Sequence, residues 1–178
     1  ERGSLEPLLM NPARRGSLVL GKWGAVASVA MLIATLSCFS FIPAQWLLRS
    51  DTLQAMFQYG WREALAFLVL LLPLSAAMSA LLMAIAIRCR TFKEAQASST
   101  VALAIVSLLP LVTVFDQRGE SPWHLWVPAL AQSTLMTRVL KGEPLGPAEL
   151  FVPLAVSALL TLMALAWMSR RLSDAAVR

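Results

Sequence analysis

The sequence has little charge for its length, and four long stretches lack charge altogether. Charged residues make up 14% and hydrophobic residues 58% of the 178 residues, whereas soluble domains average about 25% and about 45–50%. The uncharged stretches cover approximately residues 23–46, 64–87, 97–115 and 150–168. About 20 apolar residues cross the hydrocarbon layer of a bilayer, and a charge placed at its centre is costly. We therefore predict an all-α integral membrane protein with four transmembrane helices.

The sequence also lacks the motifs of an independent enzyme or pump. It has no GxxxxGK[ST] loop and no HExxH pair, so ATP hydrolysis on a P-loop and zinc proteolysis are both disfavoured. No predicted span carries an acid or a base, which argues against a self-contained proton-coupled carrier. Cys38 and Cys89 fall at opposite ends of different spans and show no metal-ligand spacing. We expect no catalytic residue, no metal and no cofactor on this chain.

The basic residues are concentrated in alternate connectors between the spans. Ten of the fifteen Lys and Arg residues fall in 1–22, 88–96 and 169–178, and the other five fall in the longer segments 44–63 and 116–149. The positive-inside rule then predicts that both ends of the chain are cytoplasmic. Because the basic residues do not form one continuous patch, they indicate orientation in a lipid bilayer and argue against nucleic-acid binding.

The connector 116–149 contains more than a loop. Trp123 and Trp126, followed by Pro128, suit the headgroup belt at the outer face of the membrane. The lone histidine, His124, lies between the tryptophans, and we expect it at the same interface. The run 128–140 is amphipathic and too short to cross, so it is an interfacial or a re-entrant helix.

Three prolines fall within predicted spans or near their ends, at Pro73, Pro110 and Pro153. Proline removes a backbone donor and kinks a helix, which membrane bundles tolerate. The simpler interpretation is ordinary bundle packing, and the alternative is a hinge used in gating. In the second span, Ser75, Ala76, Ser79 and Ala80 form a small-xxx-small face suited to close helix packing.

The first 22 residues form a separate segment in front of the membrane domain, which we assign to 23–178. Leu5, Leu8 and Leu9 recur at helical spacing, and Asn11 followed by Pro12 is a helix start signal. The predicted helix passes Arg14 and Arg15 before it enters the membrane. This pattern is typical of a cytoplasmic helix at the membrane surface, whether it serves as an anchor or as a contact for a partner.

This segment resembles a known family. The string ERGSLEPLLMNPARRGSLVLGKW is similar to the cytoplasmic segment between spans two and three of ABC transporter permeases, and most of all to the sodium-extrusion (NatB-like) group, whose pattern is approximately ERxxLExLLxxPxSRxxLxxGK. The strings at 90–96, at 127–132 and at 141–143 resemble the same group in the same order. The chain departs from the pattern at Arg14, where serine is usual, and at Ala131, where asparagine is common.

The resemblance implies a permease subunit with six spans, of which this chain would carry spans three to six. ATP and Mg would be bound by a separate ABC ATPase subunit, and a second permease copy, identical or different, would complete the transporter. The expected location is the bacterial cytoplasmic membrane, and the expected activity is export, with sodium as the candidate substrate. A non-transporting membrane protein, such as an assembly factor or a sensor membrane anchor, is the alternative.

The resemblance also implies where the ATPase would touch this chain. The apolar contacts would come from Leu5, Leu8 and Leu9, with Glu6, Arg14 and Arg15 as the polar rim. A second contact would come from Phe92, Lys93 and Glu94 in the loop between the second and third spans.

Overall fold

A computed structural model describes residues 15–46, 59–111, 113, 122–143 and 146–174, and these residues are helical wherever they are regular. The elements are α2 (Arg15–Trp46), α4 (Trp61–Arg88), α5 (Phe92–Leu108), the 3-10 helix η2 (Pro122–Trp126), α7 (Pro128–Leu140) and α8 (Pro147–Asp174). Three of these helices, over 16–44, 61–88 and 147–172, are long and apolar enough to cross a membrane. The predicted all-α class is confirmed, with α2, α4 and α8 in the places of the first, second and fourth predicted spans.

The helices do not begin and end at the same residues as the predicted spans. Helix α2 begins before the predicted start at residue 23, and α4 and α8 extend beyond the predicted bounds at both ends. The hydropathy of the sequence falls where the lipid-embedded part of a helix ends. The backbone hydrogen bonds of the helix continue further, through Lys22 in α2 and through Glu149 in α8. The predicted third span corresponds to α5, which begins earlier, at Phe92, and ends earlier, at Leu108. Leu109 keeps α-helical backbone angles, and Pro110 has no N–H to continue the helical hydrogen-bond ladder, which accounts for the early end.

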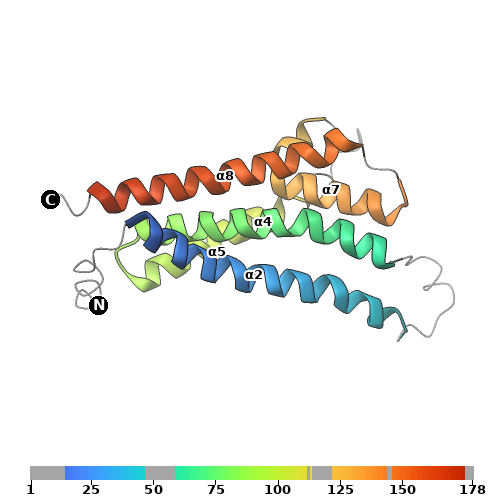
Figure 1. Ribbon diagram of the computed structural model, residues 1–178, viewed down its shortest axis with the longest axis horizontal. Coiled ribbons are helices and arrows are strands. Elements are labelled where there is room, and N and C mark those ends of the chain that lie inside the picture. Colours follow the sequence, from blue (N-terminus) through green and yellow to red (C-terminus); the bar gives the residue numbers. More distant parts are fainter. Residues whose placement is uncertain (1–14, 47–58, 112, 114–121, 144–145, 175–178) are drawn as a thin grey trace.

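Helix α4 is the centre of the bundle and packs against both α2 and α8 (Figure 1). Its buried face includes Ala76, Ser79 and Ala80 of the predicted small-residue face, together with Ala77, whereas Ser75 is only partly buried. Small side chains let helix backbones approach closely, which is what drives association in lipid. Here the Trp23 indole N–H of α2 donates a hydrogen bond to the Ala76 carbonyl of α4, at 3.2 Å.

Two hydrophobic clusters fix the bundle at its two ends. One is built on Val19 of α2 with Leu165 and Met168 of α8. The other is built on Cys38 of α2 with Tyr59, Ala64 and Phe67 in and before α4. The Tyr59 hydroxyl donates a hydrogen bond to the Cys38 carbonyl at 3.0 Å, so the buried hydroxyl of this cluster has a hydrogen-bond partner.

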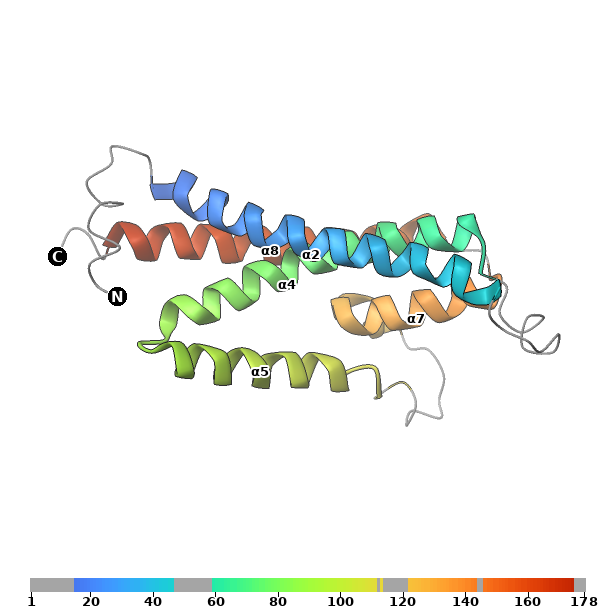
Figure 2. The same ribbon diagram turned by 90° about the horizontal axis from the view of Figure 1, so that it is seen from below.

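Helices α5 and α7 lie beside this three-helix core. Figure 2 shows α5 running back along α4 from the end where α4 finishes. It packs mainly against α4 and has no buried residue within its described length. Helix α7 packs against α4, α8 and η2 and buries five residues, so it belongs to the folded body, and its bounds match the predicted 128–140.

The packing of α4 gives a first prediction. Ala80 is fully buried, so the packed interior leaves no room for the added atoms of an Ala80→Leu substitution. We expect the variant to lose about 1–3 kcal/mol of stability, as overpacked cores do, measured as a lower melting temperature of the purified protein. The matched control is Ala86→Leu, on an exposed position of the same helix. Equal melting temperatures for the two variants would contradict this account of the core.

Candidate functional site

The structure brings three segments rich in basic residues to one end of the bundle. The start of α2, the turn between α4 and α5 and the end of α8 lie together there (Figures 1 and 2). We call this the basic end, defined by the exposed residues Lys22, Arg88, Arg90, Lys93, Arg170 and Arg171. The start of α4, the end of α7 and the start of α8 lie at the opposite end, which we call the α7 end. The charge alternation seen along the sequence is thus a real separation in space.

The turn between α4 and α5 presents two of the predicted contact residues. The Thr91 hydroxyl caps α5 by accepting the Glu94 backbone N–H at 3.2 Å, and the Glu94 carboxylate accepts the Arg90 backbone N–H at 2.9 Å. Glu94 is therefore occupied in holding the turn. Phe92 is 76% exposed, and Lys93 beside it is also exposed. A large aromatic ring next to a cation on a fixed turn is suited to contact another surface.

The other predicted contact residues fall mostly outside the described part of the chain. These are Leu5, Glu6, Leu8, Leu9 and Arg14. Arg15 is the first residue of α2, so the segment 1–14 leads directly into a helix that starts at the basic end.

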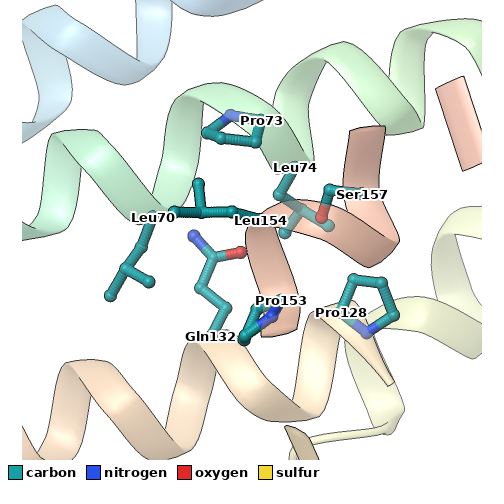
Figure 3. Close-up of a pocket in the computed structure, with 8 residues that line it drawn as sticks. All are labelled: Leu70, Pro73, Leu74, Pro128, Gln132, Pro153, Leu154 and Ser157. Carbon is teal, nitrogen blue, oxygen red and sulfur yellow. The ribbon is translucent and has the colours of Figure 1, made fainter. Parts of the chain in front are cut away.

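The predicted hinge prolines separate into two groups. Pro73 of α4 and Pro153 of α8 both line one small cavity, together with Pro128, the first residue of α7 (Figure 3). Pro110 follows the end of α5, where its carbonyl accepts the Thr113 hydroxyl at 2.7 Å. Two of the three prolines therefore meet at the junction of α4, α7 and α8, which the sequence alone did not indicate.

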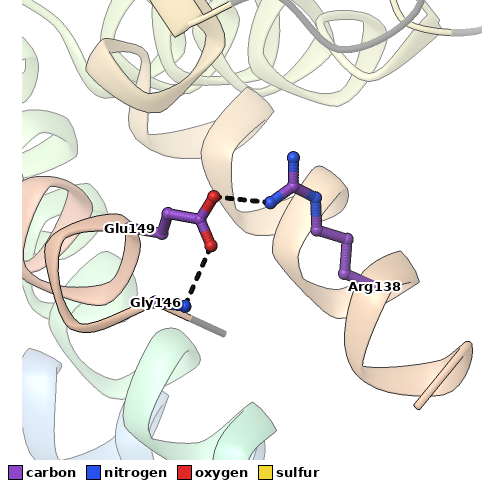
Figure 4. A network of polar contacts seen from close by, with 3 residues as sticks. All are labelled: Arg138, Gly146 and Glu149. Atoms are coloured by element: carbon purple, nitrogen blue, oxygen red, sulfur yellow. Dashed lines mark hydrogen bonds and ion pairs between the residues drawn. The ribbon is translucent and has the colours of Figure 1, made fainter. Parts of the chain in front are cut away.

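A hairpin of α7 and α8 forms the α7 end. Arg138 Nη1 lies 2.7 Å from Glu149 Oε1, and the Gly146 backbone N–H donates to Glu149 Oε2 at 3.0 Å (Figure 4). The C-terminus of α7 is closed by a Schellman motif, in which the N–H of Glu143 donates to the Arg138 carbonyl and Gly142 has a φ of 72°. Glycine adopts this conformation without strain. Sequence reasoning missed the ion pair, although two opposite charges flanking a Gly- and Pro-rich turn were a usable signal.

His124 differs from our expectation. We predicted it at the membrane interface with its neighbouring tryptophans, but it is only 1% exposed, whereas Trp123 and Trp126 are exposed. In a 3-10 helix, residues three apart share a face, so the two tryptophans turn outward together and His124 turns toward the bundle. Its two ring nitrogens have no hydrogen-bond partner among the described residues.

These features define an all-helical, multi-pass membrane protein without a catalytic constellation in its described part. The profile of the ABC-2 family transporter proteins matches residues 1–122, and the chain therefore belongs to that family. It is a membrane component of the ABC transport type, and permeases of this family typically work with an ABC ATPase. No curated protein and no solved structure matches the chain.

The α7–α8 ion pair gives a second prediction. Arg138→Glu places two carboxylates together, so we expect faster amide hydrogen exchange in α7 and in the first turn of α8. The double variant Arg138→Glu/Glu149→Arg should restore slow exchange, with a coupling free energy of about 0.2–1 kcal/mol because both side chains are partly exposed. The control is Lys141→Glu, an exposed position close by. No recovery in the double variant would show that the pair does not hold the hairpin.

Proposed function

We propose that this chain is the membrane-spanning part of an ABC exporter, with its basic end in the cytoplasm and α5 as a fourth span. The support is geometric. The chain leaves α4 at the basic end and enters α8 at the α7 end, and α5 runs back in that direction (Figure 2). Its 17 residues extend about 26 Å at the standard helical rise, which is at the short limit for a span. An even number of spans then places the start of α2 and the end of α8 on one side.

Of the two interpretations of α7, we propose the re-entrant one. Pro128 and Gln132 of α7 line the same cavity as Pro73 of α4 and Ser157 of α8. Ser157 lies ten residues after the start of α8 at Pro147, which is about 15 Å along the helix. An interfacial helix lying flat on the outer surface would not reach that depth. The exposed rings of Trp123 and Trp126 would then contact lipid in the outer leaflet.

We propose that the ABC ATPase docks at the basic end. Phe92 and Lys93 project there, and the segment with Leu5, Leu8 and Leu9 directly precedes α2 in the sequence. Helix α2 is tied to α8 through Val19 and to α4 through the Trp23 hydrogen bond. A movement imposed on the start of α2 would therefore be transmitted to α4, which packs against each of the other α-helices. By the resemblance, two permease copies would assemble with two ATPases, which bind ATP and Mg.

The docking proposal is tested by co-purification with the ATPase encoded beside this chain. We expect Leu8→Glu/Leu9→Glu to abolish co-purification, because the contact loses its apolar side chains. We also expect Phe92→Ala to weaken it. The matched control is Phe151→Ala, an equally exposed phenylalanine near the opposite end. Unchanged co-purification of both test variants would leave only membrane anchoring as the role of the segment.

Export, and sodium as its substrate, are proposed from the motif resemblance. Within the described residues, no group of three or more His, Cys, Asp or Glu could hold a metal ion. The hydroxyls of Thr35 and Ser75 donate to carbonyls of their own helices, at 2.7 and 2.8 Å, so they act in packing.

The substrate is tested in vesicles that contain the permease and its ATPase. We expect ATP addition to drive sodium across the membrane, and we expect Leu8→Glu/Leu9→Glu to abolish the flux. An ATPase that co-purifies normally while no ATP-dependent sodium flux occurs would reject sodium and leave the permease assignment intact.

A further inference from the structure

A small, partly open cavity lies where α4, α7 and α8 meet. It is lined by side chains of all three helices, namely Leu70, Pro73, Leu74, Pro128, Gln132, Pro153, Leu154 and Ser157 (Figure 3). Its volume is about 10 Å³ for the centre of a water molecule, and one bound water needs about 10–15 Å³ on this measure. The cavity therefore has the size of a single-water site.

Gln132 is the polar side chain that makes this cavity unusual. It is only 6% exposed, and its Nε2 amide has no hydrogen-bond partner among the described residues. A buried donor without a partner is destabilising, because it has given up its hydrogen bonds to water, and bulk water does not reach membrane depth to restore them. The Gln132 amide N–H therefore lacks a hydrogen-bond acceptor, and the cavity that Gln132 lines has room for one.

Other buried hydroxyls in the bundle do not share this problem. Thr134 donates to the Leu130 carbonyl at 2.9 Å, Thr161 to the Ser157 carbonyl at 2.8 Å and Ser79 to the Ser75 carbonyl at 2.7 Å. Each hydroxyl is satisfied within its own helix. The longer Gln132 side chain instead reaches away from α7 toward α4 and α8 (Figure 3).

The cavity also lies where the helical hydrogen-bond ladders are interrupted. Proline has no backbone N–H, so Pro73 cannot donate to the Val69 carbonyl, and Pro153 cannot donate to the Glu149 carbonyl. The Ser157 hydroxyl lines the same space. A buried water needs two to four polar partners, and the residues that line the cavity offer the Gln132 amide and the Ser157 hydroxyl.

We propose that this cavity binds one water molecule, which accepts a hydrogen bond from the Gln132 amide and links it to the Ser157 hydroxyl. The water joins α7 to α8 beside the prolines of α4 and α8. This bridge is a polar contact between two helices in the outer half of the bundle. It does not depend on the backbone hydrogen bonds within either helix.

The test is X-ray hydroxyl-radical footprinting of the purified full-length protein, because radiolysis of a bound water oxidises the side chains around it. We expect oxidation of Leu70, a buried residue that lines the cavity, and none above background at Leu135, which is fully buried elsewhere on α7. In Gln132→Leu, oxidation of Leu70 should fall to the Leu135 level. Ser157→Ala, a smaller change, should reduce it in the same direction.

Two results would overturn the proposal. One is oxidation of Leu70 no greater than that of Leu135 in the unmodified protein. The other is strong oxidation that persists in Gln132→Leu and Ser157→Ala, which would indicate general solvent entry. Melting temperatures give an independent reading, with Thr134→Val as the control for loss of a satisfied polar group. A hydrated Gln132 predicts that Gln132→Leu lowers the melting temperature, whereas a dry cavity predicts that it raises it by removing an orphaned amide.

Discussion

The close packing of α4 between α2 and α8 is the contact on which the rest of the bundle depends. Lipid is as apolar as a leucine side chain, so burial of apolar surface does not hold these helices together as it would in water. What holds them is the near approach of backbones that Ala76, Ala77 and Ala80 allow, together with the Trp23 hydrogen bond that this approach permits. The two terminal clusters then fix the angle between the helices, and α5 and the α7–α8 hairpin are positioned by attachment to this core.

The same arrangement separates the molecule into two functional ends. The basic end gathers the cations, the exposed Phe92 and the start of α2, which together suit it to meet an ATPase. The α7 end carries the paired Arg138 and Glu149, and the cavity beside Gln132 lies deeper in the bundle. Because α4 runs between the two ends and packs against α2, α5, α7 and α8, a displacement applied at one end has a direct mechanical route to the other.

Much of this fold could be predicted from the sequence, for identifiable reasons. The uncharged stretches located α2, α4 and α8, and the bounds of α7 were right because Pro128 suits a helix start and Gly142 the position after its end. The start of α5 at Phe92 lies before the start of the predicted span, because Thr91 and Glu94 form a local cap that hydropathy does not register. The burial of His124 was not predicted, because the direction of its side chain depends on the 3-10 geometry of η2. The Arg138–Glu149 pair and the shared proline cavity depend on how helices distant in sequence come together, which one sequence does not show.

The central claim is that the basic end faces the cytoplasm and that α5 crosses the membrane between the two ends. Cysteine labelling of intact cells with a membrane-impermeant maleimide tests it most directly. The background is a variant in which Cys38 and Cys89 are replaced, with single cysteines introduced as Lys141→Cys at the α7 end and Arg90→Cys at the basic end, both exposed positions. The account predicts labelling of position 141 in intact cells and of position 90 only after the cells are opened. Labelling of position 90 from outside, or of both positions from the same side, would contradict it.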